Sequence, residues 1–351
     1  MNGIDGQGSV SDRAPLRVGL AGLGTMGRNH LRNLLARDDV LLAAVADPAA
    51  GVRAGALAAA GPGVRGFDDP AVMLAEEHLD ALIVAAPTTL HFSVAMAALR
   101  AGVAVLVEKP IAATVEEGRQ LVAAAEQSGT LLQVGHIERF NPAVRALAAR
   151  LRDGALTRIY SIKTIRGGPL PERIRDVGVG IDLATHDIDI MCHLCGERPI
   201  RAYAESSQQV HTAHEDLLYG LLAFPSGTVG LMDVNWLTPE KQRRIVVLGA
   251  EGMFQVDYLS QSLTFTRGAA TLSPTYLDGY APTFAGETVT LPVEPAEPLR
   301  RELDAFFAAV RSGGPSPVSG RDGLMALTLA KLLLASAAEG RPLSVPLEDA
   351  S

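Results

Sequence analysis

The chain has 351 residues, enough for two domains of ordinary size, and 48% of them are hydrophobic while 20% are charged. These proportions are typical of a soluble globular protein with a large core. A formal net charge of −8 disfavours nucleic acid as a partner, because nucleic-acid binding needs a basic surface. Two cysteines exclude a disulfide framework and indicate a reducing, cytoplasmic location.

Residues 1–14 contain no apolar run of the kind found in signal peptides, so we expect a disordered tail there. The stretch Ala81 to Leu99 has no formal charge, but Pro87, Thr88 and His91 interrupt its middle. A strand, a loop and a helix therefore explain it better than a membrane span does.

The first predicted strand, Arg17 to Ala21, precedes a G-x-G-x-x-G sequence and a helix to about Ala36. Glycines in this context let the backbone approach a pyrophosphate, which the helix amino end faces with unpaired N–H groups. The predicted dinucleotide loop consists of Gly22, Leu23, Gly24, Thr25, Met26 and Gly27.

The second predicted strand, Leu41 to Ala46, ends at Asp47, twenty residues after Gly27. A carboxylate at that place accepts hydrogen bonds from the adenosine ribose 2′-hydroxyl and repels a 2′-phosphate. The sequence therefore favours NAD over NADP as the cofactor.

Alternation of strands and helices continues with strands near Val64 to Phe67 and Ala81 to Ala86, and with a sixth strand at Leu131 to Val134. This alternation predicts a doubly wound parallel sheet, the Rossmann fold, over residues 15–136. The loop after the fourth strand should border the cofactor, which makes Pro87, Thr88 and His91 candidates, although His91 fits a solvated first-turn histidine equally well.

The valine-rich run from Val103 ends in Glu108, Lys109 and Pro110. It suits a strand buried on both faces, and its carboxyl end lies where open α/β sheets bind ligands. Lys109 is thus either a functional lysine or a salt-bridged one at a strand end. Thr114 and Glu117 have capping-box spacing and start a helix that Gly129 ends.

The pattern changes after His136, and residues 137–351 are expected to form a second, α+β domain with a mostly antiparallel, open-faced sheet. Helices are predicted from Asn141 to Arg152, Leu299 to Arg311 and Asp322 to Ala338. The predicted strands are Arg158 to Ile165, Ile200 to Gln208, Asp216 to Phe224, Thr228 to Trp236, Arg243 to Leu248 and Met253 to Leu259.

Residues 180–189, interpreted as one helix, place Asp182 and His186 four residues apart on one face. A carboxylate beside an imidazole fixes its tautomer and raises its basicity, as a proton-abstracting histidine requires. Asp189 and His193 continue this face, so a metal site is an alternative. Cys192 and Cys195 form a single C-x-x-C, which without a second pair favours core cysteines over a metal or redox site.

The glycine loop, the sequence Glu108-Lys109-Pro110 and the Asp182/His186 pair together resemble the Gfo/Idh/MocA family of sugar and cyclitol dehydrogenases. The resemblance covers the chain from Arg17 onward. Three stretches resemble a branch that oxidises the 3-hydroxyl of UDP-N-acetylglucosamine: residues 134–142, residues 173–189 and Asn235-Trp-Leu-Thr-Pro239.

The resemblance implies that the glycine loop and Asp47 bind NAD, with Gln133 also contacting the cofactor, and that Glu108 and Lys109 lie near the nicotinamide ribose and the reacting carbon. It also implies that Asp182 and His186 face them, so that all three of Lys109, Asp182 and His186 are catalytic and contact the substrate. Either His186 or Lys109 fits the role of the base; the other would act on the same oxygen.

Five polar residues are candidates for holding a diphosphate or sugar, because guanidinium forks match phosphate oxygens, although each arginine could equally be a solvated surface residue. They are Arg139, Asn141, Arg166, Arg173 and Arg175.

The favoured function is NAD-dependent oxidation of a nucleotide-sugar hydroxyl at C3, giving a 3-keto sugar for a later step such as transamination in amino-sugar biosynthesis. Alternatives are a dehydrogenase of inositol or of a free or phosphorylated sugar, a non-catalytic cofactor-sensing regulator, and a metal-dependent enzyme. The resemblance implies a homo-oligomer, either a dimer or a tetramer, formed through the open face of the second sheet. Net charge and the interrupted apolar stretch predict no nucleic-acid or membrane partner.

Overall fold

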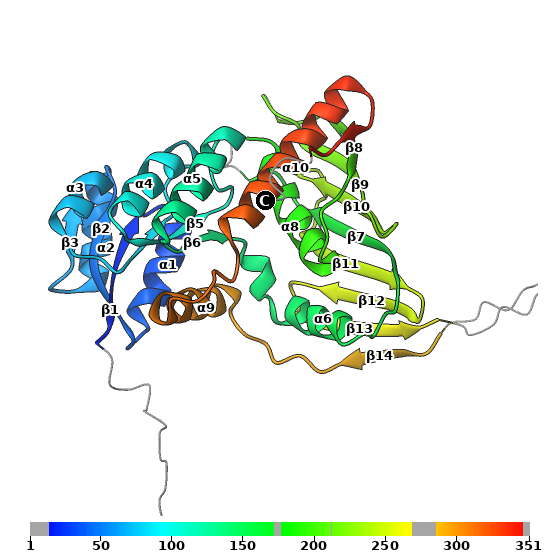
Figure 1. Ribbon diagram of the computed structural model, residues 1–351, viewed down its shortest axis with the longest axis horizontal. Helices are drawn as coiled ribbons and strands as arrows, with labels where there is room; N and C mark the ends of the chain where they lie inside the picture. The colour runs from blue at the N-terminus through cyan, green and yellow to red at the C-terminus, as the bar shows by residue number, and fades with distance from the viewer. Residues whose placement is uncertain (1–13, 172–176, 212, 269–285, 347–351) are drawn as a thin grey trace, which may run out of the picture. The chain divides into compact units, whose positions relative to one another are not determined.

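The computed structural model describes residues 14–171, 177–211, 213–268 and 286–346. Contacts divide the chain into two compact units (Figure 1). The first comprises Met1–Gly135 with Leu303–Gly320, and the second comprises His136–Glu302 with Arg321–Ser351. The segment Leu303–Gly320, which the sequence assigned to the second domain, thus groups with the first unit.

The first unit is built on a six-stranded parallel sheet of order β3-β2-β1-β4-β5-β6, which confirms the predicted Rossmann domain. Its strands are β1 (Leu16–Ala21), β2 (Val40–Ala46), β3 (Arg65–Phe67), β4 (Ala81–Val84), β5 (Ala104–Glu108) and β6 (Leu132–Gly135). The central strands β1, β4 and β5 are buried on both faces, as their unbroken apolar sequences require. The strand order reverses between β1 and β4, so the loops after these two strands flank the site where such sheets bind ligands.

Five helices connect these strands: α1 (Thr25–Leu35), α2 (Ala50–Ala60), α3 (Pro70–Glu76), α4 (Thr88–Arg100) and α5 (Val115–Ser128). The predicted capping box of α5 is confirmed, because the Thr114 hydroxyl accepts from the Glu117 N–H and the Glu117 carboxylate accepts from the Thr114 N–H. Gly129 ends α5 with a φ of +65°, which glycine adopts without strain.

Helix α9 (Pro298–Ser312) is held to the first unit by contacts with the segment after α1. The Arg37 guanidinium forms an ion pair with Asp304 and lies 5.1 Å from the centre of the Phe307 ring. Arg311 donates to the carbonyl of Asp39. Burial of Phe306 and Phe307 completes this packing, which no local sequence pattern indicates.

The second unit contains a nine-stranded, mostly antiparallel sheet of order β14-β13-β12-β11-β7-β10-β9-β8-β15, in which only β7 and β10 pair in parallel among the described strands. The predicted α+β domain is therefore confirmed. Its strands are β7 (Ile159–Gly167), β8 (Arg201–Ser207), β9 (Leu217–Ala223), β10 (Val229–Asn235), β11 (Gln242–Gly249), β12 (Gly252–Asp257), β13 (Ser262–Arg267), β14 (Thr288–Leu291) and β15 (Leu343–Ser344).

Helices pack on one face of this sheet, with α6 against β12 and β13 and α8 against β7 and β10 (Figure 1). They are the 3₁₀ helix η2 (Ile137–Phe140), α6 (Pro142–Arg152), α7 (Val179–Asp182), α8 (Ala184–Cys195) and α10 (Gly320–Glu339). No helix among the described residues is long and apolar enough to span a bilayer.

Candidate active site

The glycine loop of the first unit has the geometry that a dinucleotide requires. Gly22 has a φ of +91°, and a Cβ there would lie 2.5 Å from the Ala86 nitrogen. A Cβ on Gly27 would lie 2.0 Å from the Gly22 carbonyl oxygen, so only glycine allows α1 to approach β1 this closely. Gly24, by contrast, has no atom of the described residues within 4 Å of an added Cβ, and its own side chain provides no cap for α1. The amino end of α1, which begins with Thr25 and Met26, therefore offers a phosphate open space and backbone N–H groups that no side-chain cap occupies.

Asp47 follows β2 and is oriented by two backbone donors. Its Oδ2 accepts from the Leu23 N–H and its Oδ1 from the Ala49 N–H, both at 2.9 Å. Each carboxylate oxygen accepts more than one hydrogen bond, so this arrangement fixes the group and leaves capacity for ribose hydroxyls.

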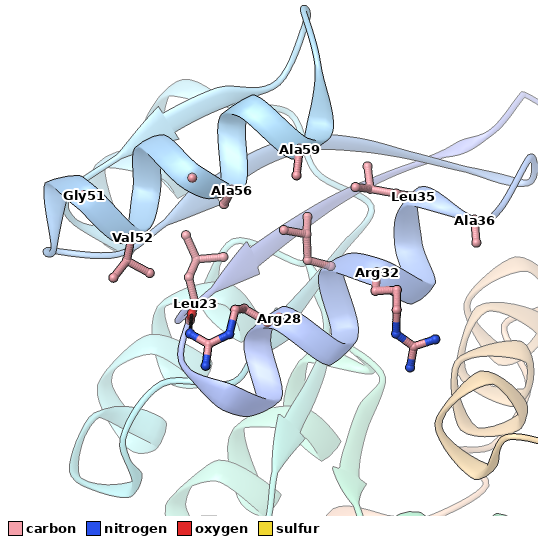
Figure 2. Close-up of a pocket in the computed structure, with 11 residues that line it drawn as sticks. Leu23, Arg28, Arg32, Leu35, Ala36, Gly51, Val52, Ala56 and Ala59 are labelled. Carbon is pink, nitrogen blue, oxygen red and sulfur yellow. Dashed lines mark hydrogen bonds between the residues drawn. The ribbon is translucent and has the colours of Figure 1, made fainter. Parts of the chain in front are cut away.

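A second feature beside this loop is an apolar groove of about 730 Å³ between α1 and α2 (Figure 2). Aliphatic side chains such as Leu35 and Ala59 line it, and the guanidinium groups of Arg28 and Arg32 lie at its rim. Of the predicted loop residues only Leu23 lines it. Few hydrogen-bonding groups face the groove, so it is distinct from the dinucleotide fingerprint.

Glu108 ends β5 as a buried carboxylate that is paired within the unit. Its Oε1 lies 2.7 Å from Nε2 of His30 on α1. Burial alone would raise the pKa of Glu108, but the His30 hydrogen bond and the charges of Lys109 and His91 lower it overall. Gly135 lies opposite Glu108 in β6, where a Cβ would be 3.0 Å from Oε2. The sequence did not point to His30, whose only signal is its place one turn after Gly27.

His91 is neither solvated nor open to a ligand through its ring nitrogens, so the solvated interpretation is wrong. The side chain is 1% exposed, with Nδ1 2.8 Å from the Pro110 carbonyl oxygen and Nε2 2.9 Å from that of Ala86. Burial lowers the pKa of His91, and the two carbonyls partly oppose that shift. The imidazole thus ties the end of β4 to the residue after Lys109.

The other predicted residues of the first unit lie at or near the carboxyl ends of strands β4, β5 and β6. Lys109 is half-buried directly after β5, joined to Pro110 by a cis peptide bond. Pro87 precedes α4 and Thr88 is its first residue. Gln133 is completely buried within β6, and neither atom of its amide has a hydrogen-bond partner among the described residues.

In the second unit, the segment with Asp182 and His186 is two helices rather than the single helix predicted. Helix α7 ends at Asp182, Leu183 intervenes, and His186 lies in the first turn of α8. The His186 N–H donates to the Leu183 carbonyl at 3.2 Å, an i to i−3 bond that marks the break. Both side chains are half-exposed, and the His186 ring lies edge-on to His136 with 6.5 Å between centroids.

Two carboxylates of α8 beside His186 are buried in ion pairs. Asp187 receives both hydrogen bonds of Arg166 Nε, at 3.0 and 3.1 Å, while Arg166 Nη1 donates to Glu138 at 2.8 Å. Burial raises the pKa of Asp187 although Arg166 opposes it. Asp189 accepts two hydrogen bonds from Arg139, at 2.6 and 2.8 Å.

Of the five candidate substrate residues, Arg139, Arg166 and Asn141 thus have internal partners. Asn141 caps α6 by accepting from the Ala143 N–H and donates to the Tyr258 carbonyl, both at 3.1 Å. Arg173 and Arg175 lie outside the described residues. Sequence reasoning missed Arg243, a half-buried arginine in β11 opposite Arg166; its position in a strand of alternating burial was the available signal.

The cysteines of the C-x-x-C are free thiols on α8. Burial raises the pKa of Cys195 to about 12 and that of Cys192 further, so neither is an activated thiolate. Among the described residues, no three His, Cys, Asp or Glu side chains are grouped so as to hold a metal ion.

Known families match both units. A family model described as an oxidoreductase family with an NAD-binding Rossmann fold, GFO_IDH_MocA, matches residues 16–136, and the GFO/IDH/MocA C-terminal domain matches residues 144–255. The UDP-N-acetylglucosamine 3-dehydrogenase of Acidithiobacillus ferrooxidans is 30% identical, covering 90% of this chain and 95% of that protein. The chain belongs to the Gfo/Idh/MocA oxidoreductase family.

Other Gfo/Idh/MocA proteins match at similar coverage. The myo-inositol 2-dehydrogenase of Thermotoga maritima is 26% identical over 95% of this chain and 99% of its own. A crystal structure of the WlbA dehydrogenase from Bordetella pertussis with NADH and UDP-GlcNAcA has a TM-score of 0.78 and 25% identity, covering 95% of this chain and 100% of that one.

This Gfo/Idh/MocA chain is therefore an NAD-dependent oxidoreductase, which confirms the predicted cofactor and enzyme class. The open space at Gly24, the uncapped amino end of α1 and the oriented carboxylate of Asp47 fit NAD. The glycine loop would hold the pyrophosphate, and Asp47 the adenosine ribose.

Proposed function

We propose that the enzyme oxidises a secondary hydroxyl of a sugar to a ketone. We propose further that the substrate is a UDP-N-acetylglucosamine-type nucleotide sugar and that its 3-hydroxyl is the group oxidised. The observation that carries this proposal is the 30% identity, across 90% of the chain, to a UDP-N-acetylglucosamine 3-dehydrogenase. The match to a UDP-sugar-bound dehydrogenase structure supports the same class of substrate. The 3-keto product would suit a later transamination, and the two free thiols suit a cytoplasmic location.

We assign the proton chemistry to Lys109, Asp182 and His186. Bound NAD supplies the two-electron oxidation of the alcohol. His186 removes the proton of the hydroxyl, and Lys109 donates a hydrogen bond that stabilises the negative charge developing on the same oxygen. Asp182 orients the imidazole and stabilises the imidazolium that forms when it takes the proton. The reverse assignment, with Lys109 as the base, uses the same atoms and differs in its pH dependence.

Substitution tests each role. Lys109→Met and His186→Ala should each lower kcat by about a hundredfold to ten-thousandfold, the range typical of a lost acid or base, while NADH affinity stays within about threefold. Near-normal turnover in either variant would remove that residue from the proposal. If His186 is the base, the acidic limb of the kcat/KM profile disappears in His186→Ala and persists in Lys109→Met; the opposite pattern assigns the base to Lys109.

A substrate panel decides the sugar. Turnover of UDP-N-acetylglucosamine, myo-inositol, glucose and glucose 6-phosphate with NAD would be followed at the NADH absorbance band. We expect the highest kcat/KM for the nucleotide sugar. Preference for myo-inositol would favour the second candidate, an inositol dehydrogenase, for which the 26% identity to myo-inositol 2-dehydrogenase is the specific support. Failure to oxidise any of the four with NAD would contradict both substrate candidates.

We further propose self-association through the face of the second sheet opposite the helices. Large apolar side chains alternate outward along three strands of this face, and each is 37–52% exposed. They are Tyr219, Leu221, Val229, Leu231 and Leu248. A contiguous exposed apolar face of this kind marks an interaction surface. Leu231→Glu should convert the oligomer to monomer in light scattering, and an unchanged mass would contradict the proposal.

A further inference from the structure

Two arginines lie side by side on the helix-covered face of the second sheet. Arg166 in β7 and Arg243 in β11 are directly opposed in the antiparallel register. Their neighbours on the same face, Thr164 and Ile245, are completely buried. Like charges directly opposite one another are destabilising, so this pair needs carboxylates nearby.

Arg166 has its compensation within the protein. Its side chain is 3% exposed and is bonded to Asp187 and Glu138, and its guanidinium carbon lies 5.2 Å from the centre of the Tyr258 ring. Two carboxylates thus face this one cation, and their charge also acts on the adjacent Arg243.

Arg243 forms no ion pair with any residue that the structure describes. Nη1 donates to the carbonyl oxygens of Gly167, at 2.6 Å, and Gln242, at 2.7 Å, and these are the guanidinium's hydrogen bonds within the described chain. Burial and the adjacent Arg166 lower the pKa of Arg243 to about 10, although Asp187, Glu138 and Asp182 act in the other direction. The N–H groups at Nε and Nη2 of this half-buried cation thus form no hydrogen bond within the described chain. The charge of Asp182 also acts on the guanidinium.

The turn at residues 235–239 holds this arginine in place. Asn235 Oδ1 accepts from the N–H groups of Leu237 and Thr238 and from the Thr238 hydroxyl, at 3.1, 2.9 and 2.7 Å. Thr238 packs so closely on Gly167 that a Cβ there would lie 2.7 Å from Thr238 Oγ1. Because the Gly167 carbonyl accepts from Arg243, the turn fixes the acceptor that orients the guanidinium. This gives a physical role to the Asn-Trp-Leu-Thr-Pro sequence.

We propose that Arg243 binds the anionic group of the substrate, a phosphate or a carboxylate, and that Gly167, Asn235 and Thr238 are positioning residues for it. The inference rests on the proposed function in placing that anion on the sugar substrate. It distinguishes acidic sugars and nucleotide sugars from neutral cyclitols, because an anion accepts charge-assisted hydrogen bonds from Nε and Nη2 that a neutral ligand replaces with weaker ones. Arg243 is thus a specificity determinant within the second unit.

Calorimetric titration of the full chain tests this. UDP supplies phosphates, glucuronate a carboxylate, and myo-inositol neither. Arg243→Gln should weaken binding of the matching anion about tenfold to a hundredfold, the range for a lost hydrogen bond to a charged group, and leave myo-inositol binding unchanged. Arg243→Lys should recover part of the loss. The matched control is Arg244→Gln, the next residue in β11, which is exposed and pairs with Asp257.

The outcomes separate this inference from the proposed function. A loss with UDP assigns the site to phosphate, and a loss with glucuronate alone assigns it to a carboxylate. Equal affinities in wild type and Arg243→Gln, equal losses for anionic and neutral ligands, or no binding of either anion by the wild type would overturn it. If Arg243→Gln oxidises UDP-N-acetylglucosamine with an unchanged KM, the anion-binding role of Arg243 is wrong and the proposed function stands. If the wild type does not oxidise this sugar but its UDP binding depends on Arg243, the proposed function is wrong and the anion-binding role stands.

Discussion

Replacing Arg166 with methionine tests whether this arginine is a structural ion-pair partner rather than a substrate ligand. The substitution removes the two hydrogen bonds to Asp187 and the one to Glu138 while keeping most of the side-chain volume. Asp187 is 1% exposed, so its carboxylate would be left buried without its cation.

Breaking a buried ion pair from one side destabilises a protein by about 3–5 kcal/mol. The side chain of Glu138 is 17% exposed and can regain water, so the lower end of that range applies, about 3 kcal/mol. For a unit of about 200 residues this corresponds to a fall in Tm of about 6–12 °C. Lys163→Met, an exposed cation on the opposite face of β7, should change stability by less than about 0.5 kcal/mol.

The pH dependence gives a second signature. Burial already raises the pKa of Asp187 in the folded state, and losing Arg166 should raise it further. A carboxyl whose folded pKa exceeds its unfolded pKa favours the folded state most below the unfolded value of about 3.9, and this contribution is lost as pH rises through the folded pKa. The variant should therefore lose less stability at pH 5 than at pH 8.

Circular dichroism melts at the two pH values measure both effects. The double variant Arg166→Met, Asp187→Asn should recover part of the loss at pH 8, because it leaves one fewer unpaired buried charge. A Tm shift below about 2 °C, or one of equal size at pH 5 and pH 8, would refute this account of the ion pair.

Three further predictions concern the first unit. Gly24→Ala should leave Tm within about 1 °C, since its Cβ meets no atom of the described residues within 4 Å, yet it should weaken NADH binding about tenfold in a fluorescence titration. Gly27→Ala, whose Cβ would lie 2.0 Å from a loop carbonyl oxygen, should instead destabilise the unit by about 3 kcal/mol in urea denaturation. Asp47→Ser should raise the KM for NAD about tenfold and improve use of NADP in steady-state assays, by removing both the ribose acceptor and the repulsion of a 2′-phosphate. His30→Leu should destabilise the unit by about 2–4 kcal/mol at pH 7 and by less near pH 4, as measured by melts at the two pH values. The reason is that the pKa of Glu108 is lowered in the folded state, so the stability linked to its ionised form is present above its unfolded pKa and is lost on acidification.

Features set by neighbouring residues were predictable from the sequence. The glycine loop and the cap at Thr114 depend on a few neighbouring residues, and Asp47 depends on its place after a short strand twenty residues beyond Gly27. The structure has all three where expected. The doubly wound parallel sheet also follows, since alternating strands and helices leave few topologies.

Features set by strand register were not predictable. Arg166 meets Arg243 across 77 positions of sequence only because β7 and β11 pair in one register. Arg139 reaches Asp189 through a contact spanning 50 positions. Sequence alone made Arg139 and Arg166 candidates for binding phosphate, because it does not show which carboxylates are near them. Strands β13 and β14 were missed because their threonines give a polar pattern that is stabilised by pairing with each other and with β12.

The two ion pairs of α8 explain a pattern that the sequence left ambiguous. In His186-Asp187-Ile188-Asp189, the second aspartate seemed to extend a possible metal stripe. Asp187 instead joins the helix to β7 through Arg166, and Asp189 joins it to η2 through Arg139. Both carboxylates are at most 3% exposed, so each is stable as a buried ion only while its arginine partner is present. Helix α8 is therefore fixed on two sides immediately after His186, and the histidine's orientation follows from residues that need never contact the substrate.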